Sequence, residues 1–152
     1  MFAERIISLI TRLNPWCQGR EFKTITVKGN SMMPAFSHGD RISIKQNPYK
    51  TELPILGDVI VFTHPGIEQT TFLKRIVGLP GDIIELKCKG IFVNSLALTP
   101  CDPDFENDSQ LLDLTWLLGD DEYYVLGDNA SDSLDSRKFG SIKLGWIIGK
   151  VW

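Results

Sequence analysis

The sequence predicts a mainly β protein of largely antiparallel strands, preceded by one short helix. After residue 23, runs of alternating or β-branched residues follow one another, and turns containing Gly, Pro or Asp separate them. Before Pro15, apolar residues instead recur at helical spacing. The chain has 152 residues, 43% of them hydrophobic, which suits one domain with a real core.

The N-terminal segment, residues 1–16, is expected to form an amphipathic helix. One of its faces is apolar and consists of Phe2, Ile6, Leu9, Ile10 and Leu13. Such a helix either lies in a membrane interface through Phe2–Leu13 or docks on its own domain or a partner. No stretch approaches the roughly 18 apolar residues of a membrane span. Arg12 interrupts the apolar run, which is unlike a cleaved export signal. We therefore expect the protein at a membrane surface without a span, or in the cytoplasm.

The expected strands follow one another along the rest of the chain. Ile42 and Ile44 share one face of their segment, and Lys89-Gly90 marks the turn of a hairpin. Residues 99–121 are acidic and contain Pro, so we expect them to be irregular. The expected strand segments are 24–29, 40–45, 57–66, 70–78, the hairpin 82–98, 122–129 and 145–152.

Charge excludes one class of partner. The formal net charge is -3, and no Lys/Arg cluster is large enough to indicate nucleic-acid binding. Between Gly90 and Ser136 the chain contains eleven carboxylates and no Lys or Arg. These carboxylates either steer a basic substrate segment or belong to a solvated acidic loop.

The cysteines and histidines do not indicate a metal or another cofactor. Cys17, Cys88 and Cys101 have no CxxC spacing, and His38 and His64 lie far apart in the sequence. Cys88 and Cys101 could pair in an oxidising compartment, whereas three reduced thiols are expected in the cytosol.

Ser31 is the first candidate functional residue. It lies in the segment GNSMMPAF, where Gly29 lets the backbone bend close to a ligand. It is either a surface serine on a loop or a nucleophile, and a nucleophilic serine needs a base. Neither histidine is placed for a Ser-His-Asp relay.

Lys74 is the candidate base. In the segment TTFLKRIVG, alternation places Phe72, Lys74 and Ile76 on one face of a strand. Burial among apolar side chains lowers the pKa of a lysine from about 10.4, and a neutral amine can accept the proton of a serine. The alternative is that the side chain extends to the edge of the sheet and keeps its charge in water.

The segment GDNASDSLDSRKFG, residues 127–140, is rich in turn-forming residues and short hydroxyls. Asp135 and Arg137 are two positions apart and could pair to brace a loop. Ser131, Ser133 and Ser136 offer hydroxyls to a nearby amine. Taken alone, the segment is typical of a surface loop.

Together, GNSMMPAFSHGD, FLKRIVGLPGD and YYVLGDNASDSLDSRKFG resemble the signature segments of the type I signal peptidases, in the same order. The resemblance extends from about Thr24 to Trp152. It implies a serine endopeptidase with an antiparallel β core over residues 24–152, and a small cap inserted at 83–121. The substrate would be a precursor protein whose signal or leader peptide is removed, with small residues such as Ala near the cut.

The resemblance also implies a role for each matching residue. Ser31 would be the nucleophile, Lys74 the general base, and Ser133 the hydroxyl that orients the lysine. The N–H of Ser31 would form part of the oxyanion hole, and its second donor is not evident because Gly29 has no side chain. Residues expected to support the site are Asp128, Asn129, Asp135 and Arg137. Those expected along the substrate groove are Gly29, Met32, Met33 and Pro34.

The sequence leaves open which kind of member this is. The absence of a membrane span and the segment GDVIVFTHPG resemble the soluble peptidases that mature nickel-type superoxide dismutase precursors. The GLPGD segment and the hairpin after it fit ordinary signal peptidases better. A non-catalytic leader-peptide-binding relative would be expected to lack Ser31, Lys74 or Ser133. A self-cleaving repressor would need a DNA-binding module, for which the first 23 residues are too short.

Overall fold

A computed structural model describes residues 21–67, 70–87, 90–98 and 114–152 of the chain. As expected, the protein is mainly β, with open antiparallel sheets. The predicted helix 1–16, the three cysteines and the segment 99–113 lie outside the described residues.

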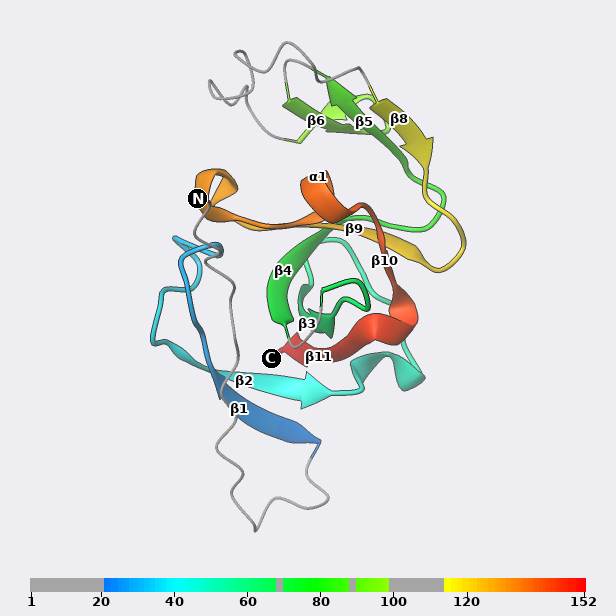
Figure 1. Ribbon diagram of the computed structural model, residues 1–152. Coiled ribbons are helices and arrows are strands. Elements are labelled where there is room, and N and C mark those ends of the chain that lie inside the picture. Colours follow the sequence, from blue (N-terminus) through cyan, green and yellow to red (C-terminus); the bar gives the residue numbers. More distant parts are fainter. Residues whose placement is uncertain (1–20, 68–69, 88–89, 99–113) are drawn as a thin grey trace.

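The larger sheet has seven strands in the order β1-β2-β11-β3-β4-β9-β10 (Figure 1). Every neighbouring pair is antiparallel. The last strand of the chain lies between β2 and β3, in the interior of the sheet. The strands are β1 (Phe22–Thr26), β2 (Arg41–Gln46), β3 (Val59–Thr63), β4 (Thr71–Gly78), β9 (Glu122–Leu126), β10 (Ile142–Lys143) and β11 (Ile147–Val151).

The smaller sheet has four strands in the order β7-β6-β5-β8 and lies beyond β9 (Figure 1). Ile84 and Leu86 of this sheet pack with Tyr124 and Leu126 of β9 in one buried cluster, which joins the two sheets. Its strands are β5 (Ile83–Lys87), β6 (Gly90–Val93), β7 (Leu96–Ala97) and β8 (Leu114–Leu117).

The smaller sheet corrects two expectations. The segment 99–121 is not wholly irregular, because β8 pairs with β5 along its length. The hairpin 82–98 contains a third strand, β7, which pairs with β6. Both strands are too short for alternation to reveal them, and β8 is held by packing, since the Trp116 ring lies 5.7 Å from that of Tyr124.

Helices are few and short in the described part of the chain. The single α-helix is α1 (Ser136–Phe139), and Asp135 caps its start by accepting a hydrogen bond from the Arg137 N–H. The 3-10 helices are η2 (Pro48–Lys50), η4 (Ala130–Asp132) and η5 (Leu144–Trp146).

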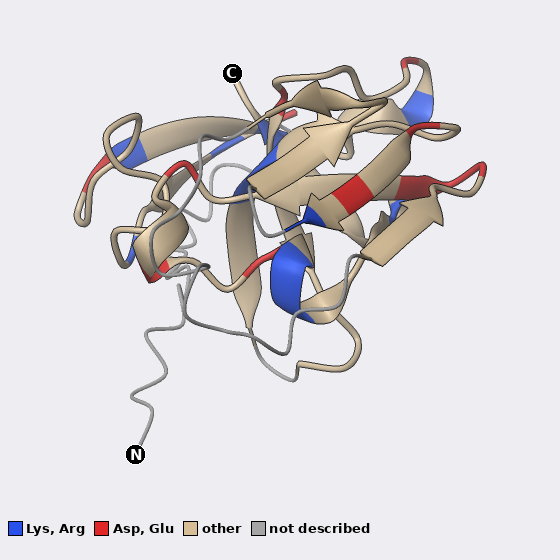
Figure 2. Ribbon diagram, turned by 90° about the horizontal axis from the view of Figure 1, so that it is seen from above, with Lys and Arg blue, Asp and Glu red and all other residues tan. Residues whose placement is uncertain are grey.

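Charged residues of both signs are interspersed among the described elements (Figure 2). Much of the acidic region is used internally, because Asp121, Asp128 and Asp135 each form an ion pair. The described carboxylates therefore favour a structural role over steering of a basic substrate. Five others, Asp102, Asp104, Glu106, Asp108 and Asp113, lie outside the described residues.

Candidate active site

Ser31 lies in the loop between β1 and β2. Two backbone hydrogen bonds close the base of this loop, from Val27 N–H to the Asp40 carbonyl at 2.8 Å and from Gly39 N–H to the Val27 carbonyl at 2.9 Å. Gly29 has a φ of 83°, a conformation that favours glycine. The turn that follows leaves Ser31 only 4% exposed.

Lys74 lies in the middle of β4, between β3 and β9. Its side chain is 1% exposed, and Phe72 and Ile76 on the same face are equally buried. Of the two alternatives that strand alternation leaves open for Lys74, the structure therefore shows burial, and the side chain does not extend to water. The amine nitrogen lies 2.6 Å from the Ser31 hydroxyl oxygen and 3.0 Å from the carbonyl oxygen of Leu73.

Burial lowers the pKa of Lys74 from its ordinary value of 10.5 to about 8. The carboxylates of Asp135 and Asp128 oppose this shift, while the Arg137 guanidinium adds to it. Near neutral pH a useful fraction of the amine is then uncharged. An uncharged amine at 2.6 Å from a hydroxyl can remove its proton.

A second loop, residues 127–135, holds the Ser31 loop in place. The Asn129 N–H donates to the Ser31 carbonyl at 3.0 Å, and the Asn129 side-chain amide donates to the Asn30 carbonyl at 3.2 Å. Gly127 lies so close that a Cβ there would be 2.5 Å from the Ser31 carbonyl oxygen and would overlap Ser133 Oγ. Sequence reasoning did not identify this close approach.

Asp135 holds the second loop together through several hydrogen bonds to its carboxylate. Its side chain is fully buried and accepts from Arg137 Nε and Nη2, both at 2.8 Å, so the predicted ion pair forms. It also accepts from the Gly127 N–H at 2.9 Å and the Ser133 hydroxyl at 2.6 Å. Each of these donors belongs to the loop or to α1, so one carboxylate fixes the whole turn.

Ser133 differs from its expected contact. The family resemblance implies a hydrogen bond between its hydroxyl and Lys74, but among the described residues Ser133 donates to Asp135. The described partners of the Lys74 amine are Ser31 and Leu73. The buried carboxylate is a strong acceptor and fixes the direction in which the Ser133 hydroxyl points.

Arg75 is a supporting residue that sequence reasoning missed. It follows Lys74 and points to the other face of β4, where it forms a two-pronged ion pair with Asp128 at 2.8 and 2.6 Å. It also donates to the Gly57 carbonyl at 3.0 Å. A lysine followed by an arginine on a strand places the two cations on opposite faces, and that signal could have identified it.

The groove candidates divide by burial. Met32 is fully buried and packs in one cluster with Ile25, Val27 and Leu73, so it forms part of the hydrophobic core. Met33 is 41% exposed, and Pro34 is also exposed. The two methionines of the segment therefore face opposite environments, and only Met33 is available to contact a ligand.

The Gly29 N–H donates to Nδ1 of His38 at 3.1 Å and is therefore already engaged. It is not the missing second donor of an oxyanion hole. Within the described residues, the Ser31 N–H has no hydrogen-bond acceptor.

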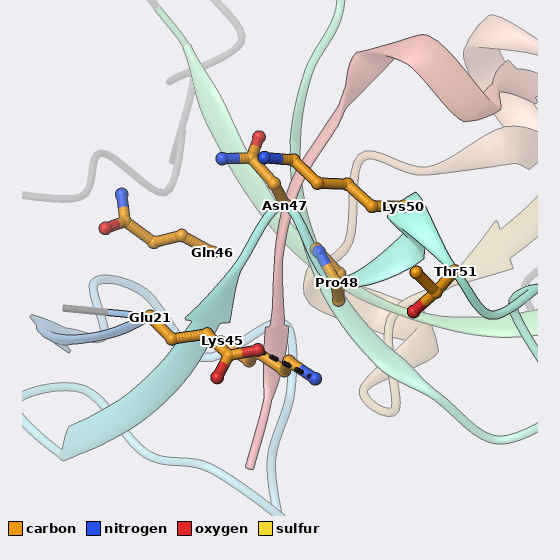
Figure 3. Close-up of a pocket in the computed structure, with 7 residues that line it drawn as sticks. All are labelled: Glu21, Lys45, Gln46, Asn47, Pro48, Lys50 and Thr51. Atoms are coloured by element: carbon orange, nitrogen blue, oxygen red, sulfur yellow. Dashed lines mark ion pairs between the residues drawn. The ribbon is translucent and has the colours of Figure 1, made fainter. Parts of the chain in front are cut away.

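Other features of the described residues lie apart from this site. A surface pocket between the start of β1 and η2 contains the Glu21–Lys45 ion pair, at 2.9 Å, and no candidate residue (Figure 3). No group of His, Cys, Asp and Glu in the described ranges could hold a metal ion. Within the same ranges, no helix has the length and apolar character needed to cross a bilayer.

Comparison with known proteins gives four consistent findings. Residues 7–152 match the family described as "Signal peptidase, peptidase S26". The chain is 34% identical over 142 residues to signal peptidase IB of Staphylococcus aureus, covering 83% of this chain and 73% of that protein. It is 33% identical over 144 residues to signal peptidase I of Bacillus caldolyticus, covering 86% and 77%. A crystal structure of a signal peptidase I from Enterococcus faecalis V583 superposes with a TM-score of 0.50 at 28% identity, covering 66% of this chain and 98% of that one.

Proposed function

The chain belongs to the signal peptidase family, peptidase S26, and we propose that Ser31 and Lys74 are its catalytic dyad. Its function is that of a signal peptidase I, a serine endopeptidase that acts on precursor proteins carrying signal peptides. The observation that supports the dyad is the 2.6 Å contact between a buried amine and the Ser31 hydroxyl.

In the proposed mechanism the neutral amine of Lys74 takes the proton of Ser31 as the hydroxyl oxygen attacks the scissile carbonyl. The Ser31 N–H donates to the oxygen that becomes negative in the tetrahedral intermediate. Lys74, now charged, returns the proton to the leaving amine as the C–N bond breaks. Water then hydrolyses the acyl-enzyme, with Lys74 again acting as the base.

The loop 127–135 is proposed to keep the dyad in register. Asn129 donates to the carbonyls of both Asn30 and Ser31, and so holds the chain on either side of the Ser31 N–H. The loop is itself anchored by two ion pairs, Asp128 with Arg75 and Asp135 with Arg137. Ser133 is proposed to support Lys74 through this loop, since its hydroxyl donates to Asp135 and the described partners of the Lys74 amine are Ser31 and Leu73.

The substrate is proposed to bind as an extended strand beside β1, which is an edge strand of the larger sheet. Gly29, Met33 and Pro34 would line its path, and Met32 would form the dry floor beneath the dyad. Association with a membrane surface through Phe2–Leu13 is part of the proposal and rests on sequence pattern alone.

Incubation with two precursors, followed by mass spectrometry, tests the proposal. A secretory preprotein is expected to be cut once after its signal peptide by the wild-type protein, and more rapidly with lipid vesicles present. Ser31→Ala and Lys74→Ala are expected to be inactive but folded, and an active Lys74→Ala variant would disprove the dyad. Cleavage of a nickel superoxide dismutase precursor alone would instead support the soluble maturation role.

A further inference from the structure

His38 accepts a hydrogen bond from the backbone of the loop that carries Ser31. Its Nδ1 atom lies 3.1 Å from the nitrogen of the Gly29 N–H, two residues before Ser31. A ring nitrogen that accepts carries no proton, so the hydrogen of the neutral imidazole is on Nε2. His38 itself is exposed, and therefore contributes little by packing.

Two backbone contacts also join the arms of the loop nearer its base, between Val27 and Asp40 and between Gly39 and Val27. The contact of His38 lies two residues before Ser31 and depends on a side chain. Beyond it the chain turns at once, with the Met33 N–H donating to the Asn30 carbonyl at 3.0 Å.

The two sides of Ser31 are thus held by different partners. His38 holds the amide of Gly29 before it, and Asn129 holds the carbonyl of Ser31 after it. Gly29 has a φ of 83° and no side chain of its own to pack against neighbours, so a hydrogen bond to its amide is an effective restraint. Movement at Gly29 would displace both the hydroxyl and the N–H of Ser31.

We propose that His38 is a positioning residue for Ser31, acting as a hydrogen-bond acceptor for the Gly29 amide. The proposal rests on the function proposed for Ser31 and adds a requirement for an acceptor at the place of Nδ1. It concerns mainly the rate of the chemical step, because His38 contacts the Gly29 amide and has no hydrogen bond to Lys74.

His38→Asn and His38→Gln both replace the ring with a smaller amide, but they place the hydrogen-bond acceptor differently. The side-chain oxygen of Asn can occupy the place of Nδ1, whereas that of Gln reaches the place of Nε2. We expect His38→Ala and His38→Gln to lower kcat about tenfold, because misplacement of a reacting group acts mainly on the rate. KM should change less. His38→Asn should restore kcat to within a small factor of the wild type.

His64 offers a matched control. Its Nδ1 accepts from the Gly66 N–H, also at 3.1 Å, but beyond the end of β3, away from Ser31. His64→Gln removes the same kind of contact and should leave kcat unchanged. Hydrogen exchange at the Gly29 amide gives a second readout that does not need activity. Exchange should be faster in His38→Gln than in wild type, and slow again in His38→Asn.

The two readouts distinguish failure of this proposal from failure of the proposed function. Equal kcat values for His38→Asn and His38→Gln would overturn the positioning role, as would unchanged exchange at Gly29 in His38→Gln. If Ser31→Ala retained full activity, the proposed function would fail, while exchange at Gly29 would still show whether His38 holds the loop.

Discussion

The amine of Lys74 and the hydroxyl of Ser31 are 2.6 Å apart, although the two residues are separated by 43 positions in the sequence. Lys74 comes from the interior of β4 and Ser31 from the loop after β1. Two features bring them together. β11 pairs with both β2 and β3, and the loop 127–135 is hydrogen-bonded to the Ser31 loop through the Asn129 N–H.

Activity should rise with pH through the pKa of Lys74. With that pKa at about 8, roughly a tenth of the amine is neutral at pH 7, so kcat/KM should rise almost tenfold from pH 7 to pH 9. A pH–rate profile on a peptide substrate measures this. A flat profile over that range would contradict the assignment of Lys74 as the base.

Lys74→Met should abolish activity and stabilise the fold near neutral pH. The folded pKa, about 8, is below the ordinary 10.5, so the buried amine binds its proton less tightly than the same amine in the unfolded chain, although both are mostly protonated at pH 7. This difference between the two pKa values lowers the stability of the folded state by roughly 3 kcal/mol at pH 7. Lys74→Met removes that cost, but it also removes the hydrogen bonds of the amine, which offsets part of the gain.

Urea denaturation of Lys74→Met at several pH values tests this prediction. Wild-type stability rises between the two pKa values, so the advantage of Lys74→Met should shrink as pH increases from 8 to 10.5. Lys138→Met, at an exposed position, is the control and should show no such trend. An advantage that stays constant over this range would exclude a depressed pKa.

Gly127→Ala should lower kcat and stability together. The added Cβ would overlap Ser133 Oγ and lie 2.5 Å from the Ser31 carbonyl, so one of the two loops must move. We expect a destabilisation of about 1–3 kcal/mol and a loss of kcat on the order of 100-fold. Gly145→Ala, which meets no atom within 4 Å, is the control. Wild-type kcat in Gly127→Ala would show that the loops tolerate separation.

Asp135→Asn should destabilise the protein strongly. The amide keeps the shape but removes the negative charge that faces the Arg137 guanidinium, whose side chain is 9% exposed. Breaking a buried pair in this way costs about 3–5 kcal/mol, measurable by thermal or urea unfolding. Asp121→Asn removes a solvent-exposed partner of Lys143 and should cost under about 1 kcal/mol. Similar losses in the two variants would rule out a special role for Asp135.

The sequence was most informative where a pattern is local. Alternation in β4 placed Lys74 on the same face as Phe72 and Ile76 but left its burial open, and the spacing of Asp135 and Arg137 suggested their ion pair. Contacts between distant segments were not predictable in the same way. Nothing near Gly127 in the sequence reveals that Ser31 and Ser133 lie against it. Residues 114–117 adopt the extended conformation of β8 only because they pair with β5.

Ser133 shows the same limit in another form. Its position matches the hydroxyl that the family resemblance assigns to the lysine, yet among the described residues it bonds Asp135, two residues away, and the Lys74 amine bonds Ser31 and Leu73. Sequence similarity specifies which groups are close together. The direction of each hydrogen bond depends on which acceptor is charged and buried, and that follows from the packing of the whole loop.

The place of β11 in the larger sheet has a consequence for biosynthesis. The final strand joins β2, next to the Ser31 loop, to β3 and β4, which carry Lys74. A nascent chain without residues 147–151 contains both residues of the proposed dyad but not the strand that brings their two halves into one sheet. The two residues are therefore far apart in the order of synthesis from the strand that places them together.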